Sequence, residues 1–205
     1  MDIIIADISH AKYAEIICKT IEEAANVRGT GIAKRHPEYI IKRMENGNAV
    51  IALDGDAFVG FCYIEKWDHG KFVANSGLIV HPDYRGQGIA KLIKQKIFEH
   101  SRTKFKNAKV FSITTGLAVM KMNSDLGYKP VTFSELTKDQ SFWKGCQTCK
   151  NYDVLQRTSQ SMCLCTGMLY DPNAKNGEEQ KKIKPKVFKR LKSIKHQLFL
   201  KKNKK

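Results

Sequence analysis

The hydrophobic pattern of residues 1–133 alternates between two spacings, and each spacing predicts one kind of element. Apolar residues that are consecutive or alternate predict strands, whereas apolar residues three and four positions apart predict helices. The expected strands cover 1–8, 48–54, 57–67, 72–80, 109–114 and 128–133, and the expected helices cover 9–29, 37–46, 85–101 and 117–126. Ser9 is expected to cap the first helix, because its hydroxyl can accept an unpaired backbone N–H, and Pro37 is expected to begin the second.

The order of these elements, β-α-α-β-β-β-α-β-α-β, predicts an α/β fold in which helices flank a mixed central sheet. Residues 161–169 are a candidate for a last strand, and 138–150 are expected to be irregular. The composition shifts to Lys, Asn, Glu and Gln from Pro172. We therefore predict a domain over 1–171, which includes a cysteine-bearing segment over 138–166, and a tail over 172–205.

Composition narrows the class of protein. Apolar residues make up 42% of the 205 residues and charged residues 27%, which excludes wholesale disorder and collagen-like repeats. The longest apolar runs are far shorter than the roughly 20 residues that a membrane span needs. No basic segment, apolar stretch and small-residue cleavage site follow one another at the N-terminus, so a cytoplasmic protein is expected.

The net charge of +16 belongs mostly to the tail. The tail holds 13 of the 36 Lys and Arg residues but only 2 of the 20 Asp and Glu residues, which leaves +5 for residues 1–171. We therefore expect no specific nucleic-acid binding by the domain. The apolar positions of 186–200 predict an amphipathic basic helix. Weak contact with anionic lipid or RNA, docking on the domain or on a second subunit, and a solvated helix all stay open for it.

One segment carries a clear chemical signal: a predicted strand runs into Arg85-Gly86-Gln87-Gly88-Ile89-Ala90, which opens a helix. Glycines let the backbone bend close to a ligand, and the unpaired N–H groups of a first helical turn attract a pyrophosphate. Arg85 and Lys91 add positive charge. The segment is not a dinucleotide fingerprint, which needs a third glycine and a later acidic residue.

This segment resembles motif A of the GNAT superfamily of N-acetyltransferases, since Arg85, Gly88 and Ala90 fit its Arg/Gln-x-x-Gly-x-Gly/Ala pattern. The resemblance implies an acyl-CoA donor, with the pyrophosphate on the backbone of residues 86–91. It also implies that pantetheine lies along the preceding strand, where that strand diverges from the next. The implied CoA-binding residues are Leu78, Ile79, Val80, Arg85, Gly86, Gln87, Gly88, Ile89, Ala90 and Lys91.

The catalytic groups of many GNAT members are replaced in this sequence. The strand over 72–80 lacks the Glu that many members use as a base. The Tyr that many use as an acid corresponds to Asn123, which cannot donate a proton as a general acid. We therefore expect bound water to take part in proton transfer, and Asn75 and Ser76 are the candidates to hold it.

A closer resemblance concerns the acyl acceptor. The segments 110–115 and 127–131 are similar to the acyltransferase domain of bacterial N-acetylglutamate synthases, and Gly31-Ile-Ala-Lys-Arg-His36 is similar to a loop that holds their substrate carboxylates. Lys34 and Arg35 are the matching residues, and Arg can bind a carboxylate bidentately. Two features depart from the family: Gly116-Leu117 replaces a basic residue, and the amino-acid-kinase-like domain is missing, so feedback through that domain is not expected.

The chain resembles short N-acetylglutamate or N-succinylglutamate synthases of the Bacteroidetes. This resemblance implies acetyl-CoA or succinyl-CoA as donor, glutamate as acceptor and the first step of arginine biosynthesis. Two alternatives stay open. One is a GNAT enzyme for another amine, such as a protein N-terminus or a small molecule, and the other is a non-catalytic binding module. Homo-oligomers are compatible with either.

Four of the six cysteines form a pattern: Cys146-x2-Cys149, then Cys163-x-Cys165. A Cys-x2-Cys knuckle places two thiolates on one ion, and residues two apart on a strand face the same way. Four thiolates fit a closed structural zinc site. Ordinary reduced cysteines, or a redox or disulfide pair, are the alternatives.

Overall fold

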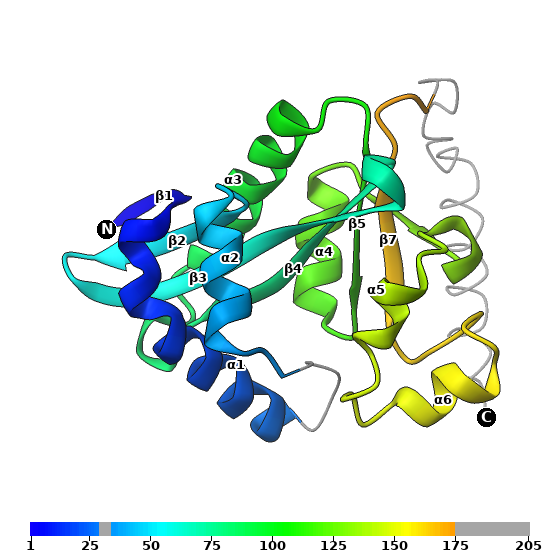
Figure 1. The fold of residues 1–205 in the computed structure, drawn as a ribbon, viewed down its shortest axis with the longest axis horizontal. Helices are drawn as coiled ribbons and strands as arrows, with labels where there is room; N and C mark the ends of the chain where they lie inside the picture. The colour runs from blue at the N-terminus through cyan, green and yellow to red at the C-terminus, as the bar shows by residue number, and fades with distance from the viewer. Residues whose placement is uncertain (29–33, 175–205) are drawn as a thin grey trace, which may run out of the picture. The chain divides into compact units, whose positions relative to one another are not determined.

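The helices and strands follow the hydrophobic pattern closely as far as residue 126 (Figure 1). The computed structural model describes residues 1–28 and 34–174. The strands are β1 (Asp2–Ala6), β2 (Ala49–Asp54), β3 (Ala57–Trp67), β4 (Phe72–Val80), β5 (Lys109–Thr114), β6 (Lys129–Val131) and β7 (Thr166–Tyr170). The helices are α1 (Ala14–Arg28), α2 (Pro37–Glu45), α3 (Ile89–Lys104), α4 (Leu117–Asp125), α5 (Gln140–Lys144) and α6 (Tyr152–Arg157).

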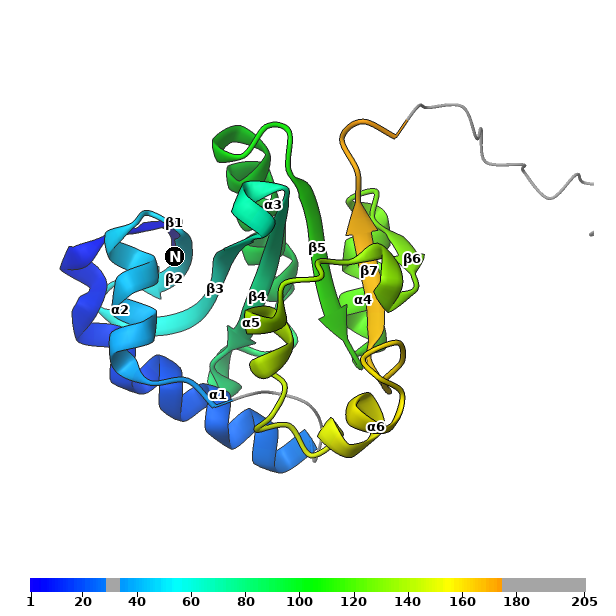
Figure 2. The same cartoon turned by 45° about the vertical axis from the view of Figure 1, so that its right-hand side comes forward.

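The seven strands form one mixed sheet in the order β1-β2-β3-β4-β5-β7-β6, as the mixed α/β prediction requires. All neighbouring pairs are antiparallel except β4 and β5, which are parallel. Helices α1 and α2 pack on one face with Tyr63 and Phe61, and α3 packs on the other with Ile64 and Val73. Helices α5 and α6 join the α1 face through Trp143 and Leu155, over β5 and β7 (Figure 2).

Two expected helix starts were wrong, for local reasons. Asp7, not Ser9, caps the first helical turn, because its carboxylate accepts the Ser9 N–H at 2.9 Å. A 3-10 helix over Ile8–Tyr13 then leads into α1. Helix α3 begins at Ile89 instead of Arg85, because Gly86 and Gly88 adopt φ angles of +80° and +77°, which no right-handed helix contains.

The chain after residue 131 differs most from the prediction. The stretch expected to be irregular contains α5, and it is followed by α6. The last strand, β7, begins at Thr166 and inserts between β5 and β6, so Cys163 and Cys165 precede the strand instead of lying on it. The predicted basic helix over 186–200 lies outside the described residues. The chain is divided into the units Met1–Pro172 and Asn173–Lys205, and all the elements above belong to the first.

The two central strands separate part of the way along their length. β4 pairs with β5 only at Phe72, Val73 and Ala74, and the last pair joins Ala74 to Phe111. Beyond it, Asn75–Val80 and Ser112–Thr114 diverge, and Figure 1 shows the opening between the two arrows. Polar backbone atoms that would have been paired in a continuous sheet are therefore available inside the molecule.

A bulge in β4 lies beside this opening. Ser76 pairs with Tyr63 and Ile79 with Phe61, so Gly77 and Leu78 together face the single residue Cys62. Gly77 has a φ angle of +65°, and a Cβ atom there would lie 2.3 Å from a Tyr63 ring carbon. Both the left-handed backbone and the close approach of Tyr63 therefore require glycine.

No helix of the described residues is long and apolar enough to cross a membrane.

The bulge generates a stability prediction. Gly77→Ala should lower the free energy of unfolding by roughly 2–4 kcal/mol, since it adds left-handed strain to overpacking against Tyr63. Gly55→Ala is the matched control, because Gly55 also has a positive φ of +57° but a Cβ atom added to it would meet nothing within 4 Å. Gly55→Ala should lower the free energy of unfolding by only about 1–2 kcal/mol. Equal losses in urea denaturation of the two variants would contradict the steric argument.

Candidate active site

The opening between β4 and β5 leads into a cavity of about 420 Å³. Helix α1 and the start of α2 border it on one side, and the segment that carries α5 and α6 borders it on the other (Figure 2). The titratable residues that line it, among those the structure describes, are Lys34, Arg35, His36, Tyr39, Tyr63, Glu65, Lys94, Cys146, Cys149, Tyr152, Cys163 and Cys165. Polar groups at the centre and apolar walls are typical of a small-molecule site.

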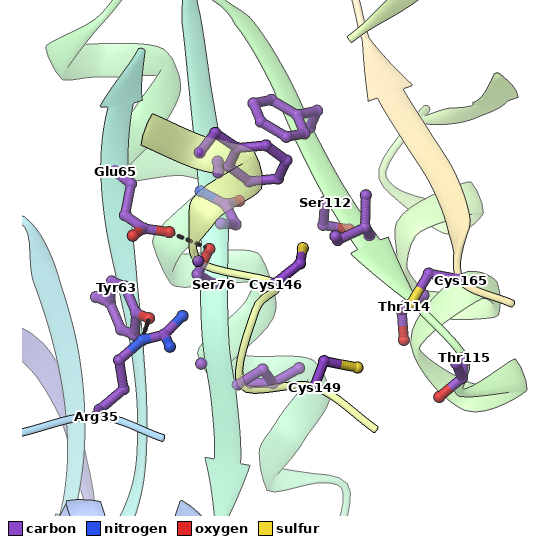
Figure 3. A pocket seen from close by; sticks show the side chains of 18 of the residues that line it. Arg35, Tyr63, Glu65, Ser76, Ser112, Thr114, Thr115, Cys146, Cys149 and Cys165 are labelled. Carbon is purple, nitrogen blue, oxygen red and sulfur yellow. Dashed lines mark hydrogen bonds between the residues drawn. The ribbon is translucent and has the colours of Figure 1, made fainter. Parts of the chain in front are cut away.

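Glu65 is the one carboxylate that lines the cavity among the described residues. It lies on β3, is only 6% exposed, and accepts two hydrogen bonds. Ser76 Oγ donates to Glu65 Oε2 at 2.6 Å (Figure 3). Tyr39 OH donates to Glu65 Oε1. Both donors are neutral hydroxyl groups, so no cation is hydrogen-bonded to this carboxylate among the described residues. Glu65 is therefore available to interact with a cationic group of a ligand in the cavity.

Arg35 brings a positive charge to the same side of the cavity. Its Nε donates to Tyr63 OH at 2.6 Å, and its guanidinium carbon lies 5.6 Å from the centre of the Tyr39 ring. Burial opposes the charge, but Tyr63 and Glu65 raise the pKa of Arg35 above its usual value. Among the described residues, the guanidinium contacts tyrosines and the Lys34 carbonyl and has no carboxylate partner, so it can bind an anionic ligand.

The two tyrosines next to Arg35 and Glu65 act as proton-bearing hydroxyls. Burial, reinforced by the Glu65 charge, raises the pKa of Tyr39 to about 12. Burial also raises the pKa of Tyr63 well above its ordinary value. Both therefore keep their protons near neutral pH. Tyr63 accepts a hydrogen bond from the Arg35 guanidinium, and Tyr39 donates one to the Glu65 carboxylate.

The three predicted catalytic side chains point in different directions in the structure. Ser76 points toward Glu65, but Asn75 points to the opposite face of the sheet, where its amide donates to Ser101 Oγ at 2.8 Å. Asn123 is fully buried, and its amide donates to Ser112 Oγ at 2.8 Å. Ser112 lines the cavity, so Asn123 supports the wall.

Lys34, the other predicted carboxylate ligand, has a partner of its own. Its Nζ lies 2.6 Å from Glu22 Oε1, and both side chains are largely exposed. The charge of Lys34 is thus partly compensated at the surface, whereas Arg35 lies inside. Residues 29–33, which include part of the loop that resembles the carboxylate-binding loop, lie outside the described residues.

The predicted phosphate turn has the expected backbone form. Gly86 and Gly88 take left-handed conformations just before α3. Arg85 Nε donates to the Val80 carbonyl at 3.1 Å, which ties the turn to the end of β4. The Lys91 N–H already donates to the Gly88 carbonyl at 3.0 Å, so this N–H group is not free for an anion. Leu78 and Ile79 line the cavity itself.

The four patterned cysteines all line the cavity, as Figure 3 shows for Cys146, Cys149 and Cys165. They do not form the predicted zinc site: among the described residues, no group of three or more His, Cys, Asp or Glu side chains could hold a metal ion. The expected strand geometry is missing, because Cys163 and Cys165 come before β7. All six cysteines are free thiols.

The wall that carries these cysteines is uncharged. Within the described part of the chain, every residue after position 132 that lines the cavity is apolar, aromatic, a thiol or a neutral polar residue. Phe142 illustrates the packing, because its ring contacts Trp67, Phe111 and Trp143 with centroid distances of 4.9–5.5 Å. One side of the cavity is therefore charged and the other is not.

Sequence reasoning missed Glu65, Tyr39 and Tyr63. A signal for Glu65 was present, since it is an acidic residue inside a predicted strand and alternates in phase with Phe61 and Tyr63. An acidic side chain on an otherwise apolar strand face requires polar partners. Tyr39 carried no such signal, because a tyrosine on an amphipathic helix is equally consistent with packing.

Comparison with known proteins gives one family. The sequence model of the Acetyltransferase (GNAT) family matches residues 18–122, half of the chain. No curated protein sequence matches the chain.

Several solved structures share the fold. The N-acetylglutamate synthase of Neisseria gonorrhoeae, complexed with coenzyme A and N-acetyl-glutamate, is similar with a TM-score of 0.60 and 14% identity over 83% of this chain. This chain covers only 34% of that protein. Rv2747 of Mycobacterium tuberculosis, in complex with CoA, has a TM-score of 0.58 and 15% identity, and the match covers 83% of this chain and 99% of that protein. A GNAT-family acetyltransferase of Staphylococcus aureus Mu50 has a TM-score of 0.60 and 16% identity, and the match covers 83% of this chain and 98% of that protein.

The environment of the cysteines generates a reactivity prediction. Burial raises the pKa of Cys146 to about 11 and that of Cys165 to about 12, and the neighbouring thiols add to both shifts. Because the thiolate is the reactive form, both should react slowly with iodoacetamide at pH 7.5. Mass spectrometry should show their alkylation rate rising about tenfold per pH unit up to pH 10. Urea-unfolded protein is the control, and equal rates in the folded and unfolded protein at pH 7.5 would contradict the prediction.

Proposed function

The chain belongs to the Acetyltransferase (GNAT) family and is an acyl-CoA-dependent N-acyltransferase, and we propose that its acceptor is the α-amine of a free α-amino acid, with L-glutamate as the first candidate. The observation that carries this proposal is that Arg35 and Glu65, a cation and a carboxylate, line the same side of the cavity without being hydrogen-bonded to each other. The proposed product with glutamate, N-acylglutamate, would be the first intermediate of arginine biosynthesis.

The arrangement of charges supports a zwitterionic acceptor. An α-amino acid carries a carboxylate and an ammonium group on the same carbon. Arg35 is suited to the carboxylate, and Glu65 is suited to the ammonium, from which it must take a proton before the nitrogen can attack. A cationic polyamine would gain from Glu65 but would be repelled by Arg35, so the pair argues against that class of acceptor.

The acyl-CoA is proposed to enter through the opening between β4 and β5. Its pyrophosphate would lie on the backbone of Gly86–Ala90, and its pantetheine would follow Leu78–Val80. The bulge at Gly77 and Leu78 interrupts the regular register, and its backbone amides are the candidates to bind the thioester oxygen. Positioning of the amine within about 3–3.5 Å of the thioester carbon would account for much of the rate enhancement.

A second acceptor class has its own supporting observation. The wall formed by residues 133–165 provides no cation for the side-chain carboxylate of glutamate within the described residues. Its rings and thiols would favour an amino acid with an apolar, aromatic or sulfur-containing side chain. Acetyl-CoA and succinyl-CoA both stay candidates for the donor.

The acceptor is tested by CoA release. Purified protein is assayed with acetyl-CoA or succinyl-CoA and with L-glutamate, L-methionine, L-phenylalanine or spermidine. Turnover with an amino acid, but not with spermidine, is expected. Arg35→Gln should raise the KM for the amino acid about 10- to 100-fold, because a hydrogen bond to a charged group contributes about 1.5–3 kcal/mol. Arg157→Gln, an exposed arginine paired with Asp153, is the control. An unchanged KM in Arg35→Gln would remove Arg35 from the site.

The role of Glu65 is tested separately. Glu65→Gln retains the shape of the side chain but cannot accept the proton, so kcat should fall about 10²- to 10⁴-fold. The Kd for CoA, measured by calorimetry, should not change. Glu99→Gln, an exposed substitution on α3, serves as the control. A kcat within twofold of wild type would rule out Glu65 as the base.

A further inference from the structure

A buried lysine lies beside the opening between β4 and β5. Lys94 is on α3, is 2% exposed and lines the cavity from the face of the sheet opposite to Glu65. Its Nζ donates to Asn75 Oδ1 at 3.2 Å and lies 3.5 Å from Tyr128 OH. Asn75 directly follows Ala74, the last residue of β4 that pairs with β5. The ammonium group therefore lies at the point where the two strands begin to separate.

The surroundings of Lys94 do not compensate its charge. In the described part of the chain, its hydrogen-bond partners are a neutral amide and a neutral phenol. Its Nζ also lies 4.8 Å from the centre of the Tyr128 ring, where the aromatic face attracts a cation. Burying an amine without a carboxylate costs free energy, and an apolar residue of the same length would avoid that cost. Packing alone therefore does not explain why a lysine occupies this position.

We propose that Lys94 is the proton donor to the sulfur of the departing CoA. This proposal rests on the acyl-CoA reaction of the family and on the proposed path of pantetheine along Leu78–Val80. A pantetheine arm that enters from Val80 extends toward the narrow end of the opening, so its thiol end approaches Asn75 and Lys94. Glu65 lies on the acceptor side of the sheet and Lys94 on the side where α3 covers it, which separates the proton acceptor from the proton donor.

The proposed step is balanced as follows. Glu65 accepts one proton from the acceptor ammonium and passes it to water. The nitrogen then attacks the thioester carbon, the C–S bond breaks, and its electron pair moves to sulfur, which takes a proton from Lys94. The second proton lost by the nitrogen restores the Lys94 ammonium. The net products are the amide, CoA thiol and one proton released to solvent.

The titration of Lys94 is consistent with this role. Burial lowers its pKa from the ordinary value to about 8, and the other titratable groups that face it are Cys62 on β3 and Tyr128. Burial raises the pKa values of both Cys62 and Tyr128, so both stay neutral around pH 8. A proton donor is most effective when its pKa lies near the working pH. An ordinary exposed lysine would hold its proton too tightly.

The test compares Lys94→Met and Lys94→Arg with wild type, using any amine that gives turnover. Both variants should lose about 100-fold or more in kcat. The side chain of Met has no ionisable proton, and that of Arg retains the charge but does not release a proton near neutral pH. The Kd for CoA should stay unchanged. Lys96→Met, which removes an exposed lysine from the same helix, should keep wild-type activity.

The pH profile gives a second readout that a purely structural role would not produce. Wild-type kcat should fall above about pH 8, as Lys94 loses its proton, and this alkaline limb should be missing from the residual activity of Lys94→Met. Three outcomes would overturn the proposal: Lys94→Arg with more than half of the wild-type kcat, a wild-type kcat that does not fall between pH 8 and 10, or variants that lose only CoA binding. Because each result is a ratio to wild type, failure of glutamate as acceptor would leave the test intact.

Discussion

The separation of β4 from β5 is the constraint on which the rest of the structure depends. Two parallel strands that paired along their whole length would seal the centre of the sheet. The bulge at Gly77 and Leu78 and the end of pairing at Ala74 leave a passage through it instead. α3 packs on one face of the sheet, whereas Arg35 and Glu65 lie on the other. In the proposed reaction, the opening would connect the acyl-CoA on the first face with the acceptor on the second.

The charged residues Arg35 and Glu65 line the cavity to which this opening leads. Arg35 and Glu65 do not share hydrogen bonds: Arg35 donates to Tyr63, whereas Glu65 accepts from Tyr39 and Ser76. A direct buried pair would gain little net stability, because both charges must be desolvated, and it would leave neither group free for a ligand. Each charge is therefore hydrogen-bonded by neutral hydroxyl groups without being neutralised by the other.

Much of the fold could be predicted from the sequence, but less of the site. The strands over 72–80 and 109–114 have the same bounds in the prediction and in the structure, because consecutive apolar runs with turn residues at both ends leave little ambiguity. The turn at 85–90 was recognisable because Arg85, Gly88 and Ala90 together match the pattern of motif A, whereas two glycines alone would also fit an ordinary turn. Glu65 and Tyr39 were missed because their roles arise from contacts between elements far apart in sequence. The zinc prediction is not supported by the described residues, because it assumed that Cys163 and Cys165 lie on a strand, whereas the strand begins at Thr166.

Because β7 inserts between β5 and β6, one continuous segment of the chain forms a separate part of the cavity wall. The chain leaves the sheet after β6, builds α5 and α6, and returns to the neighbouring position as β7. One continuous excursion thus supplies the uncharged wall of the cavity, while the phosphate turn and the central carboxylate belong to earlier elements. Substitutions at an exposed lining position such as Ser141 would alter the wall of the pocket, whereas Phe142 also packs on Trp67 and Phe111 of earlier strands. Selection could therefore move such a protein from one acceptor to another through changes confined to a stretch of about thirty residues.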